Sequence, residues 1–154
     1  MDLLLIIVLA IGVYVAAWRV LRQRSGTTTV RTEGQVQGPG KFACEVVGES
    51  KYQDHLERIT GGRTEESANI RTRAILALED DNPHDPNAVC VRIDGLRVGY
   101  LPRRFAKSYR AQLAKANGPK GHYWCAAVIV GGWDRGGGDR GHFGVRLDLP
   151  VVDD

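Results

Sequence analysis

The segment AVCVRIDGLRVGYL, residues 88–101, constrains the fold most strongly. Two strand-like apolar runs, Ala88–Ile93 and Leu96–Leu101, flank the pair Asp94-Gly95. An Asp-Gly pair between such runs supplies the positive φ angles of a two-residue hairpin turn. The segment therefore predicts two antiparallel strands, around which the rest of the domain has to be arranged.

Other runs show the same composition, and together they give the fold class. Six strands are predicted, at Phe42–Val47, Arg73–Leu78, Ala88–Ile93, Leu96–Leu101, Tyr123–Val130 and Phe143–Leu149. Six short strands and two helices in about 110 residues predict a mainly β (α+β) domain. We expect a small, OB-like or SH3-like six-stranded barrel. The order lacks the regular βαβ alternation of a Rossmann domain.

Local signals mark the two predicted helices. The sequence Ser50-Lys51-Tyr52-Gln53 fits a capping box, in which Ser50 caps the first helix and Gln53 returns the bond. Gly61-Gly62 predicts its end. Pro102 opens the second helix and Gly118-Pro119 closes it.

The N-terminal residues 1–24 form a separate unit. Leu3–Trp18 carries no charge and extends to Leu21 if Arg19 snorkels, which gives a helix of about 28 Å, close to the hydrocarbon thickness of a bilayer. Arginines follow this run while only Asp2 precedes it. The positive-inside rule then predicts a single-pass transmembrane anchor with a basic cytoplasmic flank. A cleaved signal peptide, with Val15 and Ala17 at the cleavage site, is the alternative.

Residues 25–40 are rich in Gly, Thr and Ser and predict a flexible linker, so we expect the folded domain at residues 41–150. Three cysteines, Cys44, Cys90 and Cys125, lie far apart inside predicted strands. No CxxC or CxxH spacing occurs, and buried, reduced thiols are the favoured interpretation over a disulfide or a zinc site.

Charge is distributed unevenly after the anchor. From Ser25 onward there are 18 basic and 17 acidic residues, which argues against bulk electrostatic binding of nucleic acid. Between Gly95 and Trp133, however, seven basic residues and no acid occur. On the second helix, Arg103, Lys107 and Arg110 fall opposite the apolar stripe. This ridge is either a solvated helix face or a surface that contacts phosphates.

The loop EDDNPHDPNAV, residues 79–89, carries four carboxylates, one histidine and two prolines. A stiff turn explains it, because Asp85 before Pro86 can accept a hydrogen bond from a backbone N–H two residues on. A metal site built from Asp81, His84 and Asp85 lacks a further ligand at suitable spacing. Neither a nucleophile elbow, an HExxH motif nor a P-loop occurs, so we expect a protein that is not an enzyme and needs no cofactor or metal.

Three segments together resemble a HIRAN domain: V-V-G at Val46–Gly48, N-P-x-D-x-N-A-V at Asn82–Val89, and V-G-Y-L at Val98–Leu101. HIRAN domains occur in helicase-like DNA-repair proteins and as stand-alone bacterial domains. The resemblance runs from Phe42 to Leu149. It implies an OB-like barrel that binds single-stranded DNA by its free 3′ end, and with the anchor it implies a domain on the cytoplasmic side of a bacterial inner membrane.

The resemblance also implies roles for individual residues. Asp85 would contact the terminal 3′-hydroxyl, because an ionised carboxylate only accepts hydrogen bonds and repels a 3′-phosphate. Asn82 shares its loop, and His84 holds the place of a base-stacking aromatic. The remaining candidates for nucleic-acid contact are Lys51, Tyr52, Tyr100, Arg103, Lys107 and Phe143.

A second hypothesis remains beside DNA binding. The chain has Ser50-Lys51-Tyr52 where helicase-linked members carry an Arg-aromatic pair, and Glu79, Asp80 and Asp81 place negative charge beside the expected site. A protein-interaction module that keeps the barrel without the DNA function would explain these departures, the near-neutral charge and the tether. The partners expected from the sequence are therefore single-stranded DNA, the membrane, or another protein.

Overall fold

A computed structural model describes residues 32–116 and 121–150 of the chain. Within these residues the fold is mainly β with two α-helices, as the sequence predicts. The strands are β1 (Thr32–Gln35), β2 (Cys44–Glu45), β3 (Ala68–Leu78), β4 (Val89–Ile93), β5 (Leu96–Tyr100), β6 (His122–Gly131) and β7 (Phe143–Leu147). The helices are α2 (Gln53–Thr60) and α3 (Arg103–Lys115), and a 3-10 turn, η1 (Glu49–Lys51), precedes α2.

The anchor predicted at residues 1–24 lies outside the described residues. Within residues 32–116 and 121–150, no helix is long and apolar enough to cross a membrane. The closing signal Gly118-Pro119 of the second helix also lies outside them, whereas the end of the first helix is confirmed: Gly61 follows α2 in the left-handed conformation.

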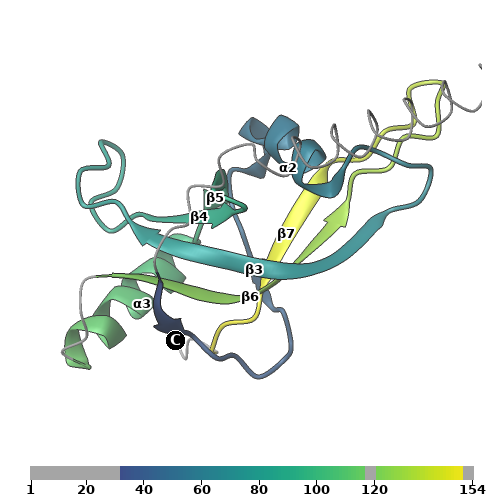
Figure 1. The fold of residues 1–154 in the computed structure, drawn as a ribbon. Helices are drawn as coiled ribbons and strands as arrows, with labels where there is room; N and C mark the ends of the chain where they lie inside the picture. The colour runs from purple at the N-terminus through teal and green to yellow at the C-terminus, as the bar shows by residue number, and fades with distance from the viewer. Residues whose placement is uncertain (1–31, 117–120, 151–154) are drawn as a thin grey trace, which may run out of the picture.

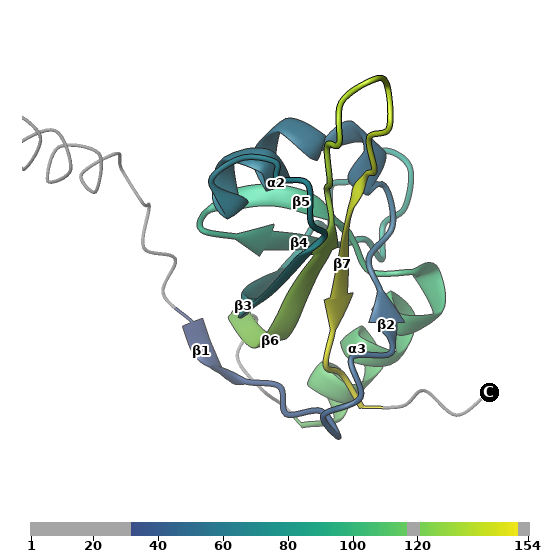
Figure 2. The ribbon, with the colours of Figure 1, turned by 90° about the vertical axis from the view of Figure 1, so that its right-hand side faces the viewer.

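The strands form one sheet in the order β2-β7-β6-β3-β4-β5, and β1 pairs with β6. Strand β3 runs the length of the molecule and curls with β6 into a half-barrel (Figure 1; Figure 2). The predicted hairpin is confirmed, because β4 and β5 pair antiparallel across a turn in which Asp94 and Gly95 have φ angles of 49° and 77°.

One bridge joins the two ends of this curled sheet. Val47, just after β2, and Tyr100 of β5 exchange two backbone hydrogen bonds, each 2.9 Å long. This contact requires Gly99, which has a φ of 154°. A Cβ atom there would collide with the Val46 side chain and lie 2.6 Å from the Val47 carbonyl oxygen. The segments V-V-G and V-G-Y-L therefore meet in space.

The hydrophobic core fills the concave side of the sheet. Leu56 of α2 and Ala106 and Tyr109 of α3 pack there, and the fully buried strand residues include Leu76 and Ile129. The three cysteines are free and buried, and burial raises the pKa of Cys44 and of Cys125 to about 12. They therefore pack as small apolar side chains.

The structure corrects the linker prediction for residues 32–40. Strand β1 pairs parallel with the start of β6, and the N–H of Val36 donates to the Trp124 carbonyl oxygen at 2.8 Å. The buried carboxylate of Asp148 then accepts hydrogen bonds from the N–H groups of Gly40 and Lys41, at 2.7 and 3.1 Å. Backbone hydrogen bonds attach this edge strand to β6, and such bonds can form with almost any side chain, so composition alone does not predict the strand.

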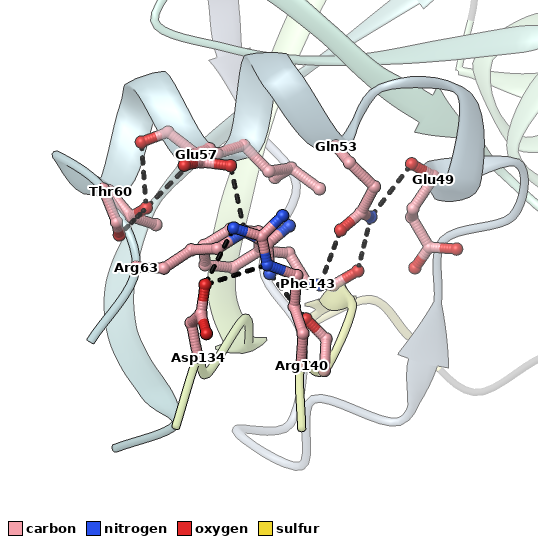
Figure 3. A network of polar contacts seen from close by, with 11 residues as sticks. Glu49, Gln53, Glu57, Thr60, Arg63, Asp134, Arg140 and Phe143 are labelled. Carbon is pink, nitrogen blue, oxygen red and sulfur yellow. Dashed lines mark hydrogen bonds and ion pairs between the residues drawn. The ribbon is translucent and has the colours of Figure 1, made fainter. Parts of the chain in front are cut away.

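The predicted capping box is wrong. Helix α2 begins at Gln53, and no side-chain hydrogen bond caps its N-terminus. Gln53 instead reaches β7, where its amide oxygen accepts from the Phe143 N–H at 2.8 Å and its Nε2 donates to the Phe143 carbonyl oxygen at 3.0 Å (Figure 3). Gln53 Nε2 also donates to the Glu49 carbonyl oxygen at 3.1 Å, so this side chain links the η1 turn to β7 and does not cap α2 (Figure 3).

Candidate nucleic-acid interface

A cavity of about 800 Å³ opens between the η1 turn, strand β5 and the loop of residues 79–88. The structure brings seven of the nine predicted site residues together around it: Lys51, Tyr52, Asn82, His84, Asp85, Tyr100 and Arg103. These residues come from three segments far apart in the sequence, and the bridge between Val47 and Tyr100 holds two of those segments together. We call this cavity the loop cavity.

The loop of residues 79–88 is held in a defined conformation by hydrogen bonds between its own side chains and backbone. The Asn82 amide oxygen accepts from the N–H groups of His84 and Asp85, at 2.9 and 3.2 Å. Asp85 Oδ1 accepts from the Asn87 N–H at 2.9 Å, which is the turn predicted from the sequence. Because its amide oxygen is occupied by the loop backbone, Asn82 serves first to position its neighbours.

The second carboxylate oxygen of Asp85 is the chemically distinctive group of the loop cavity. Asp85 Oδ2 lies 3.8 Å from Arg103 Nε, and the Asp85 side chain is 21% exposed whereas that of Arg103 is 79% exposed. Such a loose, exposed ion pair contributes little to stability. Asp85 can therefore do two things at once: Oδ1 closes the turn, and Oδ2 is left to accept a hydrogen bond from another group.

Glu79 holds together three other residues of the loop cavity, Arg97, Asn82 and Tyr100, by accepting hydrogen bonds from each of them. Its Oε1 accepts from Arg97 Nη2 at 2.7 Å, and its Oε2 accepts from Asn82 Nδ2 and the Tyr100 hydroxyl at 3.0 and 3.1 Å. Burial alone would raise the pKa of Glu79, but the hydrogen bond from Asn82 and the positive charge of Arg97 outweigh it and hold that pKa below its ordinary value. Burial, with the charge of Glu79, raises the pKa of Tyr100 to about 12, so its hydroxyl remains a donor at neutral pH.

These contacts reduce the repulsion that the acidic residues of the loop would exert on a phosphate. The sequence alone predicts such repulsion from Glu79, Asp80 and Asp81. Glu79 is compensated by Arg97, and Asp80 is paired with Arg110 at 2.6 Å. Asp81 is exposed and lines the loop cavity. Most of the suspected repulsion is therefore neutralised within the domain.

Arg97 was missed from the sequence. It lies three residues before Tyr100, and in a regular strand such residues point to opposite faces. The pairing of β4 with β5 shifts between Val91 and Arg92, and this irregularity places Arg97 and Tyr100 on the same face, with the guanidinium 5.5 Å from the ring centre. This irregularity is defined by the pairing of β5 with β4, so the alternation of residues along β5 alone does not predict it.

Lys51 and Tyr52 are held at the rim by contacts behind them. Glu49 Oε1 accepts from the Val145 N–H at 3.3 Å. Gln53, the first residue of α2, bonds to the backbone of Phe143 (Figure 3), so the chain is fixed to β7 on both sides of Lys51 and Tyr52. The Tyr52 ring stacks on His55, with the ring centres 5.8 Å apart. The half-buried Tyr52 ring therefore has one face partly occupied.

Phe143 does not belong to the interface, which corrects the prediction. Its side chain is only 3% exposed, and the Arg63 guanidinium lies 4.7 Å from its ring centre (Figure 3). Arg63 is fixed in turn by Glu57 at 2.9 Å and by the Gly141 carbonyl oxygen at 2.6 Å. A ring enclosed in this way cannot stack on a base.

The predicted ridge on α3 is also smaller than expected. Arg110 donates to the carbonyl oxygens of Asn87 and Ala88, at 2.8 and 2.9 Å, as well as to Asp80, and so it holds the loop from behind. Lys107 is exposed on α3 and does not line the loop cavity. Arg103 alone of the three lies at the cavity.

The loop cavity therefore combines cationic side chains, half-buried rings and one available carboxylate oxygen. Across residues 32–116 and 121–150, no group of three or more His, Cys, Asp or Glu side chains is placed to hold a metal ion. Fold and cavity together define a small β domain with an open, polar cavity where the two ends of its sheet meet.

The family follows from comparison with known proteins. The model of the HIRAN domain matches residues 39–118, more than half of the chain, and the chain belongs to the HIRAN-domain family. The matched residues include the whole loop cavity but not β6 or β7, to which the resemblance in sequence had extended. Searches of curated proteins and of solved structures found no match. HIRAN domains bind single-stranded DNA, which supports nucleic-acid binding by this chain.

Proposed function

We propose that this chain is a single-stranded DNA-binding module that recognises a free 3′-hydroxyl end in the loop cavity. The observation that carries the proposal is the divided use of Asp85: Oδ1 is committed to the Asn87 N–H, while Oδ2 remains available beside Arg103. A hydroxyl can donate to Oδ2, whereas a terminal phosphate would meet a negative charge.

The other residues have matching roles in this proposal. Arg103 and Lys51 would contact the phosphates next to the terminal nucleotide. The exposed ring of His84 and the open face of Tyr52 would stack on bases, which contributes roughly 1–3 kcal/mol per base. Glu79 acts indirectly, because it holds Tyr100 and Arg97 in place. The chain would act by binding rather than by catalysis.

We further propose that residues 1–24 tether the module to a bacterial inner membrane, with residues 41–150 in the cytoplasm. The support is the uncharged run Leu3–Trp18 followed by Arg19, Arg22 and Arg24.

The competing proposal is a protein-interaction module, and one observation favours it. Val47 is 45% exposed and lines the loop cavity, so an apolar side chain is available there for contact with a protein partner. Titration of the full chain by fluorescence anisotropy separates the two proposals. DNA-end recognition predicts tighter binding of a single strand with a 3′-hydroxyl than of a 3′-phosphorylated or circular strand. Absence of DNA binding at low salt would favour a protein partner.

A further inference from the structure

The convex face of the sheet carries a second cluster of basic and aromatic residues. Arg71 and Arg73 lie two residues apart on β3, so they share a face. Arg71 pairs across the sheet with Val128 of β6, and Val128 pairs with Arg146 of β7. Directly paired residues project to the same side, so the three arginines form one surface, which we call the arginine face.

This surface faces away from the core. The residues that alternate with the arginines, such as Ala74 on β3 and Cys125, Ala127 and Ile129 on β6, are buried. Arg71, Arg73 and Arg146 are exposed. The face also contains a groove of about 740 Å³, lined among others by Lys41, Arg71 and Arg146.

The two β3 arginines are held by rings. The Arg71 guanidinium lies 4.7 Å from the centre of the Phe42 ring, and that of Arg73 lies 4.3 Å from the centre of the Trp124 ring. Neither guanidinium is ion-paired with or hydrogen-bonded to any residue in the part of the chain that the structure describes. A guanidinium stacked on a ring is pre-oriented, and its N–H edge remains free for a phosphate.

Acidic compensation on this face is slight. Arg146 is paired with Glu45 of β2 at 3.4 Å, and both side chains are more than half exposed, which makes the pair weak. Strand pairing also connects the face to the loop cavity, because Ile75, two residues beyond Arg73, pairs with Arg92, which in turn pairs with Arg97 of the cavity wall. Strand spacing and rise make this path from Arg97 to Arg71 roughly 23 Å long.

We propose that the arginine face binds the sugar–phosphate backbone of the DNA strand whose 3′ end occupies the loop cavity. This inference rests on the proposed function and extends it. The path fits the roughly 4–16 nucleotides that single-strand sites of OB-like folds cover. Stacked guanidinium groups match phosphates in two-pronged hydrogen bonds and also offer a plane on which bases stack.

A membrane surface fits the arginine face less well. Binding in the headgroup region relies on large apolar side chains that insert between lipids. Among the described residues, the exposed large hydrophobic side chains are Val47 and Ile70. Val47 lies at the loop cavity, and Ile70 alternates with Arg71 and so projects to the opposite face.

The test compares single strands of about 3 and about 12 nucleotides with the same 3′-hydroxyl end, binding to the full-length chain in detergent. Wild type is expected to bind the long strand more tightly. Arg71→Gln with Arg73→Gln should lose this length-dependent gain, lower the salt slope for the long strand by about 1.4, and bind the short strand as wild type does. Arg58→Gln with Lys115→Gln, which removes two exposed charges from helices α2 and α3, is the matched control.

Further outcomes are decisive as well. Arg71→Lys with Arg73→Lys keeps the charge but not the planar fork, and an intermediate affinity for the long strand would support the proposal. If the Gln pair and the helix control bind the long strand equally, the arginine face has no role, even where the preference for a 3′-hydroxyl persists. If wild type binds neither strand, the proposed function fails and this inference fails with it.

Discussion

Replacing Glu79 with Gln tests the wall of the loop cavity. The carboxylate accepts three hydrogen bonds, from Arg97, Asn82 and Tyr100, and its side chain is 18% exposed. If the Gln oxygen keeps Arg97, its NH₂ group faces the Asn82 N–H, and that donor loses its acceptor. Hydrogen bonds to charged groups contribute about 1.5–3 kcal/mol each, and Tyr100 can rotate to accept from the new NH₂ group. We expect the free energy of unfolding to fall by roughly 2–4 kcal/mol.

Urea denaturation at neutral pH measures this loss. With a slope of about 2 kcal/mol per molar urea, the midpoint should fall by about 1–2 M. Asp81→Asn is the control, because this exposed acid of the same loop is bonded to none of the described residues, and we expect a change within about 0.5 kcal/mol.

The pH dependence makes the prediction specific to the charge. Because the folded-state pKa of Glu79 lies below its ordinary value of 4.5, its ionised form stabilises the fold above that pH. This contribution is lost as the pH falls through the folded-state pKa. The difference between wild type and Glu79→Gln should therefore shrink as the pH falls further below 4.5. A difference under about 0.5 kcal/mol at neutral pH, or one that does not change with pH, would refute the reasoning.

Two further predictions concern the α3 arginines and the N-terminal residues. Arg103→Gln should lower the salt slope of DNA binding by about 0.7, as expected for one phosphate contact on a single strand. Arg110→Gln should instead lower the free energy of unfolding, because Arg110 holds the loop backbone. The reverse pair of effects would show that the roles of the two arginines are exchanged. The full chain should sediment with membranes and a chain lacking residues 1–24 should not, as followed by fractionation and immunoblotting; a soluble full chain would contradict the anchor.

Features set by neighbouring residues could be predicted from the sequence. The Asp94-Gly95 turn depends on two φ angles that few other residue pairs adopt, and it was found where predicted. The Asp85 turn depends on the proline that follows and on a carboxylate two residues before its donor, and it was also found. Such features require no knowledge of distant segments.

Features set by a distant partner could not be predicted. Gln53 looked like a helix cap because its bond to Phe143 lies 90 positions away. Arg97 was missed because the irregular pairing that turns it toward Tyr100 belongs to both strands. Strand β1 was hidden because its composition is that of a linker, while its bonds come from the open edge of β6.

The candidate site shows the same division. Asp85, Asn82 and His84 of the N-P-x-D segment all line the loop cavity, because they are neighbours in the sequence. Phe143 was proposed from its position on a late strand, where alternation alone leaves two possible faces. Only the packing of Arg63 and Gln53 around it decides that it is buried.

The most direct test of the central claim is the preference between 3′-hydroxyl and 3′-phosphate ends in wild type and Asp85→Asn. Asn at this position keeps an oxygen for the Asn87 N–H and removes the negative charge, so the turn should persist. A hydrogen bond to a charged group contributes about 1.5–3 kcal/mol, and the lower value corresponds to a preference of about tenfold. Anisotropy titrations should show wild type preferring the 3′-hydroxyl strand by at least this factor, and Asp85→Asn binding the two strands within about threefold of each other. Equal binding of both ends by wild type, or an undiminished preference in Asp85→Asn, would contradict recognition of the 3′ end by Asp85.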